Sequence, residues 1–76
     1  MNFKENDVIQ LDKKMSGEFF NNKYNGIPEG TKGTIYKIQQ TSNIEWVLSV
    51  KWENNRTLNV LYPIDHISKV KLTKGD

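Results

Sequence analysis

The chain of 76 residues contains no cysteine and only one histidine, His66. Without cysteine, neither a disulfide bond nor a thiolate–metal site can stabilise the fold. A single histidine also excludes a histidine-based metal cluster within one chain. We therefore expect neither a metal nor a cofactor, and the absence of cysteine agrees with a reducing compartment.

Long apolar segments are missing as well. No run approaches the roughly 20 apolar residues of a membrane-spanning helix, and residues 1–7 lack the apolar core of a signal peptide. The sequence therefore predicts a soluble, cytoplasmic protein without membrane association, and its initial methionine indicates a complete small open reading frame. We expect residues 1–76 to form a single domain with a small, compact core.

The charge balance is only mildly basic. Eleven basic and nine acidic side chains give a net charge of +2, short of the strongly basic composition of a dedicated nucleic-acid-binding domain. Ten of the eleven basic residues are lysine, and nine asparagines and seven isoleucines accompany them. Because the codons for these three residues are rich in A and T, part of the lysine content reflects genomic bias rather than an anionic partner.

Alternating apolar residues predict five short strands. These strands cover residues 7–11, 34–39, 45–52, 56–62 and 68–72. In the first strand Ile9 and Leu11 share the inward face, and Val8 lies on the other. Residues 12–26 break the pattern with glycine and asparagine and show no steady helical period, so we predict a long loop.

A loop of this length in a small domain often carries function. We expect Met15 and one of the two phenylalanines, Phe19 or Phe20, to cover one open end of the fold. The turn after the loop is rich in proline and glycine. Pro28 fixes φ for this turn, and Gly30 supplies a positive φ soon after it.

Gly33 lets the chain enter the second strand through a bend that a side chain would obstruct. Ile35 then points inward, and a break in the alternation predicts a bulge at residues 36–37. The next two strands form a hairpin whose cross-strand partners share a face. An apolar partner for Val50 requires an odd-numbered loop, so a three-residue loop at 53–55 is predicted. The expected pairs are Val50 with Leu58, Leu48 with Val60, and Trp46 with Tyr62, with Asn55 in the left-handed conformation.

Residues 63–67 predict a single helical or 3₁₀ turn, because Pro63 fits the first turn of a helix. In the last strand Val70 and Leu72 point inward, and residues 73–76 form a frayed tail. Together these elements predict an all-β fold, a small five-stranded SH3-like barrel with a long first loop. The alternative is an OB-type five-stranded barrel, which usually carries a helix between its third and fourth strands.

Four motifs carry a resemblance to a known family. They are Asn-Asp-Val-Ile-Gln-Leu at residues 6–11, Pro-Glu-Gly-Thr-Lys-Gly-Thr-Ile at 28–35, Val-Lys-Trp-Glu-Asn-Asn at 50–55, and Asp65. The chain resembles small bacterial SH3-like barrels of unknown function, often found in phages and mobile elements. Their pattern reads Gly-Asp-x-Val-x-Leu, Pro-Gly-Thr-x-Gly-Thr-Val, Val-x-Trp-Asp-Asn-Gly and a later Asp. The resemblance implies a fold and transfers no catalytic residues.

Nothing in the sequence indicates catalysis. There is no cysteine nucleophile, and the serines lack a nucleophile-elbow motif. Asp65 and His66 are adjacent and point in different directions, so we expect Asp65 to cap the turn and His66 to be exposed. The segment from Gly30 to Gly33 lacks the Lys-Ser/Thr ending of a phosphate-binding loop. We predict that the protein is not an enzyme.

We predict instead a binding module for another protein, present as a monomer or weak dimer. In SH3-like barrels an aromatic-lined groove often lies between the first long loop and a later hairpin loop. The candidate contact residues are Phe19, Phe20, Tyr24, Tyr36, Trp52 and Tyr62. Trp52 and Tyr62 fit ordinary core packing equally well. The resemblance further implies a phage or mobile-element product that modulates a host protein.

Nucleic-acid binding is the alternative. Small barrels bind single strands by stacking bases on exposed aromatic side chains beside lysine or arginine. The candidate cations are Lys13, Lys14, Lys23, Lys37 and Lys51. Glu18, Glu29 and Glu53 are interspersed among them, which favours a solvated face of mixed charge.

Overall fold

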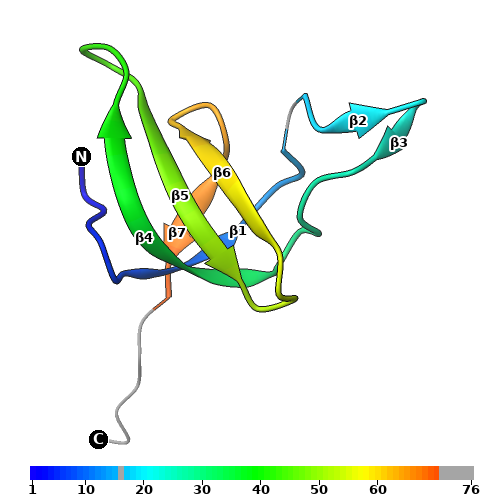
Figure 1. The fold of residues 1–76 in the computed structure, drawn as a ribbon, viewed down its shortest axis with the longest axis horizontal. Helices are drawn as coiled ribbons and strands as arrows, with labels where there is room; N and C mark the ends of the chain where they lie inside the picture. Colours follow the sequence, from blue (N-terminus) through cyan, green and yellow to red (C-terminus); the bar gives the residue numbers. More distant parts are fainter. Residues whose placement is uncertain (16, 71–76) are drawn as a thin grey trace, which may run out of the picture.

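The fold consists of a five-stranded antiparallel sheet and a separate two-stranded hairpin. The structure is a computed structural model that describes residues 1–15 and 17–70. The strands are β1 (Val8–Leu11), β2 (Phe19–Phe20), β3 (Lys23–Tyr24), β4 (Lys32–Gln40), β5 (Trp46–Trp52), β6 (Thr57–Tyr62) and β7 (Ile67–Lys69). The large sheet has the order β6-β5-β4-β1-β7, and β2 pairs only with β3. Figure 1 shows the sheet curled, with β1 and β7 behind β5 and β6, and the hairpin standing apart.

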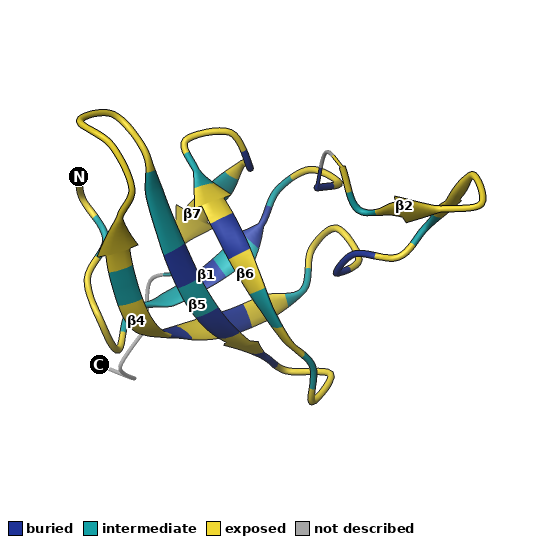
Figure 2. Ribbon diagram, turned by 45° about the horizontal axis from the view of Figure 1, so that its top comes forward, coloured by how far each residue is buried: buried dark blue, intermediate teal, exposed yellow. Residues whose placement is uncertain are grey.

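Apolar residues on the concave side of this curl form the core. Ile9 and Leu11 of β1 are fully buried, as predicted, and Val8 on the opposite face is half-buried. The buried residues that join them are Met15, Ile27, Ile35, Leu48, Val50, Trp52 and Val60. Figure 2 shows how more buried and more exposed positions alternate along β5 and β6. The core thus comes from period-two patterning, with Met15 and Ile27 added from the connection between β1 and β4.

Strand β4 begins at the glycine-rich turn and connects the two halves of the sheet. Gly30 has a φ of +89°, which confirms the predicted turn. Gly33 pairs with Ile9 on one side and with Trp52 on the other. The register of β4 against β5 shifts between Ile35 and Lys37, so the predicted bulge is confirmed. Because the bulge increases the local twist, β4 can pair with β1 at its start and with β5 along its length.

The β5–β6 hairpin has the predicted register. Val50 lies opposite Leu58, Leu48 opposite Val60, and Trp46 opposite Tyr62. Asn55 has a φ of 66°, in the left-handed region expected for the last residue of a three-residue loop. The odd loop length keeps the apolar residues of both strands on the core side.

The single helical or 3₁₀ turn predicted at residues 63–67 is wrong. A non-helical turn follows a cis Tyr62–Pro63 peptide bond. Asp65 closes this turn through two hydrogen bonds to Leu61. Its N–H donates to the Leu61 carbonyl at 2.7 Å, and its Oδ2 accepts from the Leu61 N–H at 2.9 Å. The carboxylate therefore accepts from a backbone N–H of β6, the strand before the turn, and does not cap a helix after it. His66 is exposed, as expected.

The last strand is shorter and lies earlier than predicted. β7 covers Ile67–Lys69 and pairs with β1, and Ile67 packs against the core. Val70 is half-buried, and its N–H donates to the Val8 carbonyl at 2.9 Å. The expected inward position of Leu72 and the predicted tail at 73–76 lie outside the described residues.

The long loop predicted at residues 12–26 contains the β2–β3 hairpin instead. Asn21 and Asn22 have φ values of 51° and 64°, as a two-residue type I′ turn requires. This turn places Phe19 opposite Tyr24 and Phe20 opposite Lys23. The Asn-Asn pair between two short aromatic segments was the sequence signal for it.

The described residues are all-β and contain no helix, whereas the OB-type alternative usually carries one between its third and fourth strands. β6 and β7 form the two edges of the large sheet and are not paired with each other, so no closed barrel of hydrogen bonds is formed over residues 1–15 and 17–70. In that same part of the chain, no helix is long and apolar enough to cross a membrane.

Candidate binding site on the aromatic hairpin

Residues 18–25, here called the aromatic hairpin, project from the body of the molecule (Figure 1). The Asn25 N–H donates to the Glu18 carbonyl at 2.7 Å, which extends the pairing beyond β2 and β3. Phe19 and Phe20 are 54% and 70% exposed. They lie on opposite faces of the hairpin, because neighbouring residues of a strand alternate. The hairpin therefore presents a phenylalanine to each side.

The expectation that one of these phenylalanines covers an open end of the fold is wrong. Pairing within the hairpin holds both away from the core, and Met15, which is buried as predicted, packs in the core without either of them. Tyr24 is the hairpin aromatic that packs against the core. Its ring lies 5.4 Å from the Phe19 ring at 59°, so the two aromatics support each other.

The Tyr24 hydroxyl anchors the hairpin to the core. It accepts a hydrogen bond from the Met15 N–H at 2.9 Å and donates one to the Ile27 carbonyl at 2.6 Å. Met15 and Ile27 are themselves buried, so this hydroxyl joins both ends of the hairpin to the interior. A Cβ on Gly26 would lie 2.6 Å from the hydroxyl oxygen, and glycine at this position leaves room for it.

Arg56 adds a second anchor that sequence reasoning missed. Its Nη1–H donates to the Gly26 carbonyl at 3.2 Å, which connects the base of the hairpin to the β5–β6 loop. The signal in the sequence was that Arg56 is the single arginine, beside ten lysines. A guanidinium presents several N–H donors in a fixed plane, and lysine cannot reproduce that geometry.

Two of the predicted contact residues, Trp52 and Tyr62, do not lie on the aromatic hairpin. Trp52 is 3% exposed, and its indole N–H donates to the Leu58 carbonyl at 3.1 Å. Tyr62 packs against Phe3, with ring centroids 5.3 Å apart, and against Trp46 at 6.3 Å. The expected single groove lined by all six aromatics is therefore not formed.

Tyr36 lies elsewhere again, at the bulge of β4, where it is 48% exposed. Among the six aromatics, the structure brings together only Phe19, Phe20 and Tyr24. The five candidate lysines also separate into two groups. Lys13, Lys14 and Lys23 lie on or before the hairpin, while Lys37 and Lys51 belong to β4 and β5.

In the first of these groups, Lys14 contacts an aromatic side chain of the hairpin. Its Nζ lies 5.5 Å from the centroid of the Tyr24 ring, within the range of a cation–π interaction. No group of three or more His, Cys, Asp or Glu side chains that could hold a metal ion occurs within residues 1–15 and 17–70. The site therefore offers exposed aromatic surface beside lysines.

Removal of the Tyr24 hydroxyl should loosen the hairpin without changing its exposed surface. We expect Tyr24→Phe to destabilise the protein by about 1–3 kcal/mol, because the Met15 N–H and the Ile27 carbonyl lose their shared partner. Urea denaturation followed by circular dichroism measures this change. Tyr36→Phe, which alters an exposed hydroxyl, should remain within about 0.5 kcal/mol of the wild type. Equal losses in the two variants would contradict the anchoring role.

A family model described as a domain of unknown function (DUF4314) matches residues 19–70. No curated protein and no solved structure matches the chain.

Proposed function

Because the chain belongs to the DUF4314 family, whose description states no activity, we propose its function from geometry: it is a non-enzymatic module that binds a protein through the aromatic hairpin. The observation that carries the proposal is the exposure of Phe19 and Phe20 on an anchored hairpin. Large apolar side chains in such a position lose contact with water only when a partner covers them.

The same proposal includes the finer description of the fold as a small SH3-like barrel. The sheet order β6-β5-β4-β1-β7 supports it, since a long, bulged β4 pairs with both β1 and β5. In this arrangement the aromatic hairpin lies in the long first connection, between β1 and β4. The scaffold then holds the base of the hairpin in place, and the exposed tip contacts the partner.

Anchoring reduces the entropy lost on binding. The Tyr24 hydroxyl and the Arg56 guanidinium hold the hairpin base before any partner arrives. A preorganised loop requires less ordering at the interface, so more of the gain from apolar burial appears as affinity. Burial of one phenylalanine side chain contributes about 1.5–3 kcal/mol.

We extend the proposal to the kind of partner. The resemblance to small barrels of phages and mobile elements favours a host protein that this chain modulates as a monomer or weak dimer. An apolar pocket on that protein would enclose the hairpin tip and receive both Phe19 and Phe20, as hot-spot aromatics are received in other interfaces. The lysines beside the hairpin favour an acidic rim around the pocket.

Binding should depend on both hairpin phenylalanines. We expect Phe19→Ala/Phe20→Ala to weaken partner binding by about 2–4 kcal/mol, or roughly 30- to 1000-fold, and to leave the thermal melt almost unchanged because both side chains are exposed. Pull-down from host lysate identifies the partner, and calorimetry with the purified partner measures the affinity.

The matched control is Ile44→Ala/Ile64→Ala, which removes two other exposed apolar side chains outside the hairpin. This variant should bind as the wild type does. If the phenylalanine variant retains the same partners with the same affinity, the hairpin is not the binding site. If both double variants lose affinity equally, the effect is not specific to the hairpin.

A further inference from the structure

Basic and acidic side chains lie in different parts of this fold, although they are mixed along the sequence. The five strands of the large sheet contain four lysines, Lys32, Lys37, Lys51 and Lys69, and no aspartate or glutamate. All acidic residues within the described part of the chain lie in turns, loops and the N-terminal segment. Lys69 is neutralised by Asp7, with its Nζ 3.6 Å from Oδ2. The other three strand lysines belong to β4 and β5.

The pairing register places these lysines relative to one another. Residues that alternate with the buried Leu48, Val50 and Val60 along their strands face outward, away from the core. Two rows of paired residues cross this outer face: Lys37, Ser49 and Asn59 in one, and Thr34, Lys51 and Thr57 in the next. Lys37 and Lys51 are diagonal neighbours, and such positions lie about 7–8 Å apart. Hydroxyl and amide groups surround them without a carboxylate in either row.

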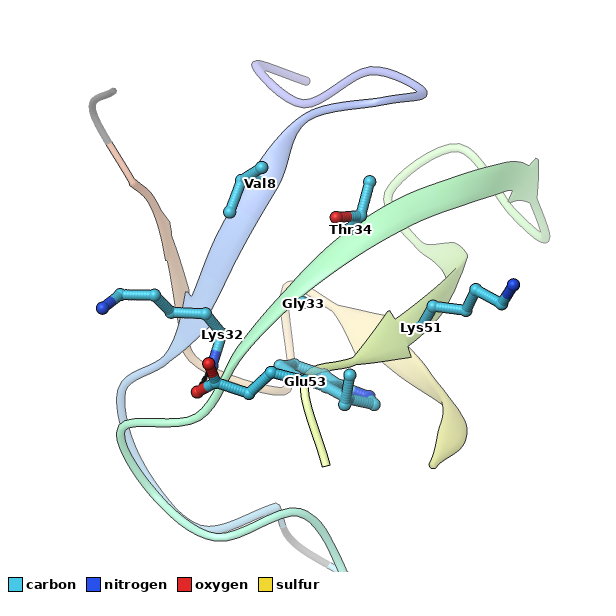
Figure 3. A pocket seen from close by; sticks show the side chains of 7 residues that line it. Val8, Lys32, Gly33, Thr34, Lys51 and Glu53 are labelled. Carbon is cyan, nitrogen blue, oxygen red and sulfur yellow. Dashed lines mark hydrogen bonds between the residues drawn. The ribbon is translucent and has the colours of Figure 1, made fainter. Parts of the chain in front are cut away.

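Two shallow hollows meet beside Lys51. One, of about 310 Å³, is lined by Val8, Lys32, Gly33, Thr34, Lys51, Trp52 and Glu53. Figure 3 shows the Lys32 and Lys51 side chains extending to opposite sides of it. The second, of about 270 Å³, shares Lys51 and Trp52 and includes Arg56. Glu53, the carboxylate that lines the first hollow, accepts a hydrogen bond from the backbone N–H of Lys32 at 3.0 Å.

Tyr36 supplies an exposed aromatic ring on the same strand. It lies next to Lys37 at the bulge of β4 and is 48% exposed. An exposed ring beside lysines can stack on an unpaired base while the lysines neutralise neighbouring phosphates. A single-stranded nucleic acid therefore makes use of both the lysines and the ring.

From this arrangement we propose that the outer face of the sheet, defined by Lys32, Tyr36, Lys37 and Lys51 and here called the basic face, binds single-stranded nucleic acid. The phosphodiester backbone crosses β4 and β5 along the lysines, and one base stacks on Tyr36. This function is independent of protein binding by the hairpin, since the two surfaces share no residue. Lys13, Lys14 and Lys23 do not take part in it.

Fluorescence anisotropy tests the proposal with labelled single-stranded DNA and RNA of about ten nucleotides. We expect Lys37→Gln/Lys51→Gln to weaken binding about tenfold or more at low salt and to reduce the slope of log affinity against log salt by about 1.4. The matched control, Lys13→Gln/Lys14→Gln, removes the same charge near the hairpin and should change affinity less than about twofold. Tyr36→Ala should weaken single-strand binding and leave duplex binding unchanged.

Each opposite result overturns the proposal. Absence of wild-type binding at micromolar protein and low salt removes the basic face as a site. Equal losses in the two lysine variants show attraction by net charge alone. Binding of polyglutamate as tight as that of the single strands identifies an acidic protein as the ligand class. Unaltered thermal melts, measured for all variants, exclude unfolding as the cause of any loss.

Discussion

Gly33→Val is expected to destabilise the protein by about 3 kcal/mol or more. For a domain of this size, that loss lowers the melting temperature by about 12–24 °C. The reason is steric. A Cβ at Gly33 would lie 2.6 Å from Val50 Cγ1, 2.8 Å from Trp52 Cε3 and 2.9 Å from the Lys51 carbonyl oxygen.

These contacts cannot be relieved independently. Val50 and Trp52 are buried in the core, and the Lys51 carbonyl belongs to the strand that pairs with β4. Gly33 is also paired with Ile9 on its other side, so a shift of β4 away from β5 would disturb the pairing with β1. A substitution here therefore strains both neighbours of β4 at once.

Thr34→Val is the matched control, because it introduces the same side chain one residue later, at an exposed position. We expect its stability to remain within about 0.5 kcal/mol of the wild type. Thermal melts of the two variants by circular dichroism give the comparison. A Gly33→Val protein that melts like the wild type would show that the glycine is not required for packing.

The fold could be predicted from the sequence where side-chain alternation and turn geometry agree. Alternation identified the inward faces, and the odd loop between β5 and β6 then fixed the pairing of Val50 with Leu58. The bulge after Ile35 was visible as a break in that alternation. Each of these features depends on residues close together in the chain, where side-chain period and turn geometry leave few alternatives.

The candidate site could be predicted only in part, because it depends on contacts between distant segments. The Arg56 guanidinium and the Gly26 carbonyl are thirty residues apart. Likewise, Glu18 and Glu29 are interspersed with lysines in the sequence but lie outside the sheet, so a mixed linear pattern becomes a basic face in three dimensions. Exposure of Phe19 and Phe20 depends on the type I′ turn between Phe20 and Lys23, which the asparagine pair indicates only weakly.

The burial of Trp52 could not be predicted from the sequence either. Its period-two position shows that it shares a face with Leu48 and Val50, but not whether the end of that face is covered. In the structure Trp52 is 3% exposed, within the core to which Met15 and Ile27 also contribute. Both of those residues come from the connection between β1 and β4. Trp52 therefore lies in a core that the alternation along β5 does not complete by itself.

Trp52→Ala should remove a large part of the total stability. Truncation of a buried tryptophan costs about 3–5 kcal/mol, against about 5–15 kcal/mol for a typical domain. The variant also loses the hydrogen bond from the indole N–H to the Leu58 carbonyl. Urea denaturation followed by far-ultraviolet circular dichroism measures the loss without depending on tryptophan fluorescence.

Two further variants separate packing from binding. Trp52→Phe keeps most of the buried ring and removes the indole donor, so we expect a smaller loss of about 1–3 kcal/mol. Phe20→Ala truncates an aromatic that is 70% exposed, and its stability should stay within about 0.5 kcal/mol of the wild type while partner binding falls. A Trp52→Ala protein with wild-type stability and impaired binding would return Trp52 to the binding site, because only an exposed contact residue gives that combination.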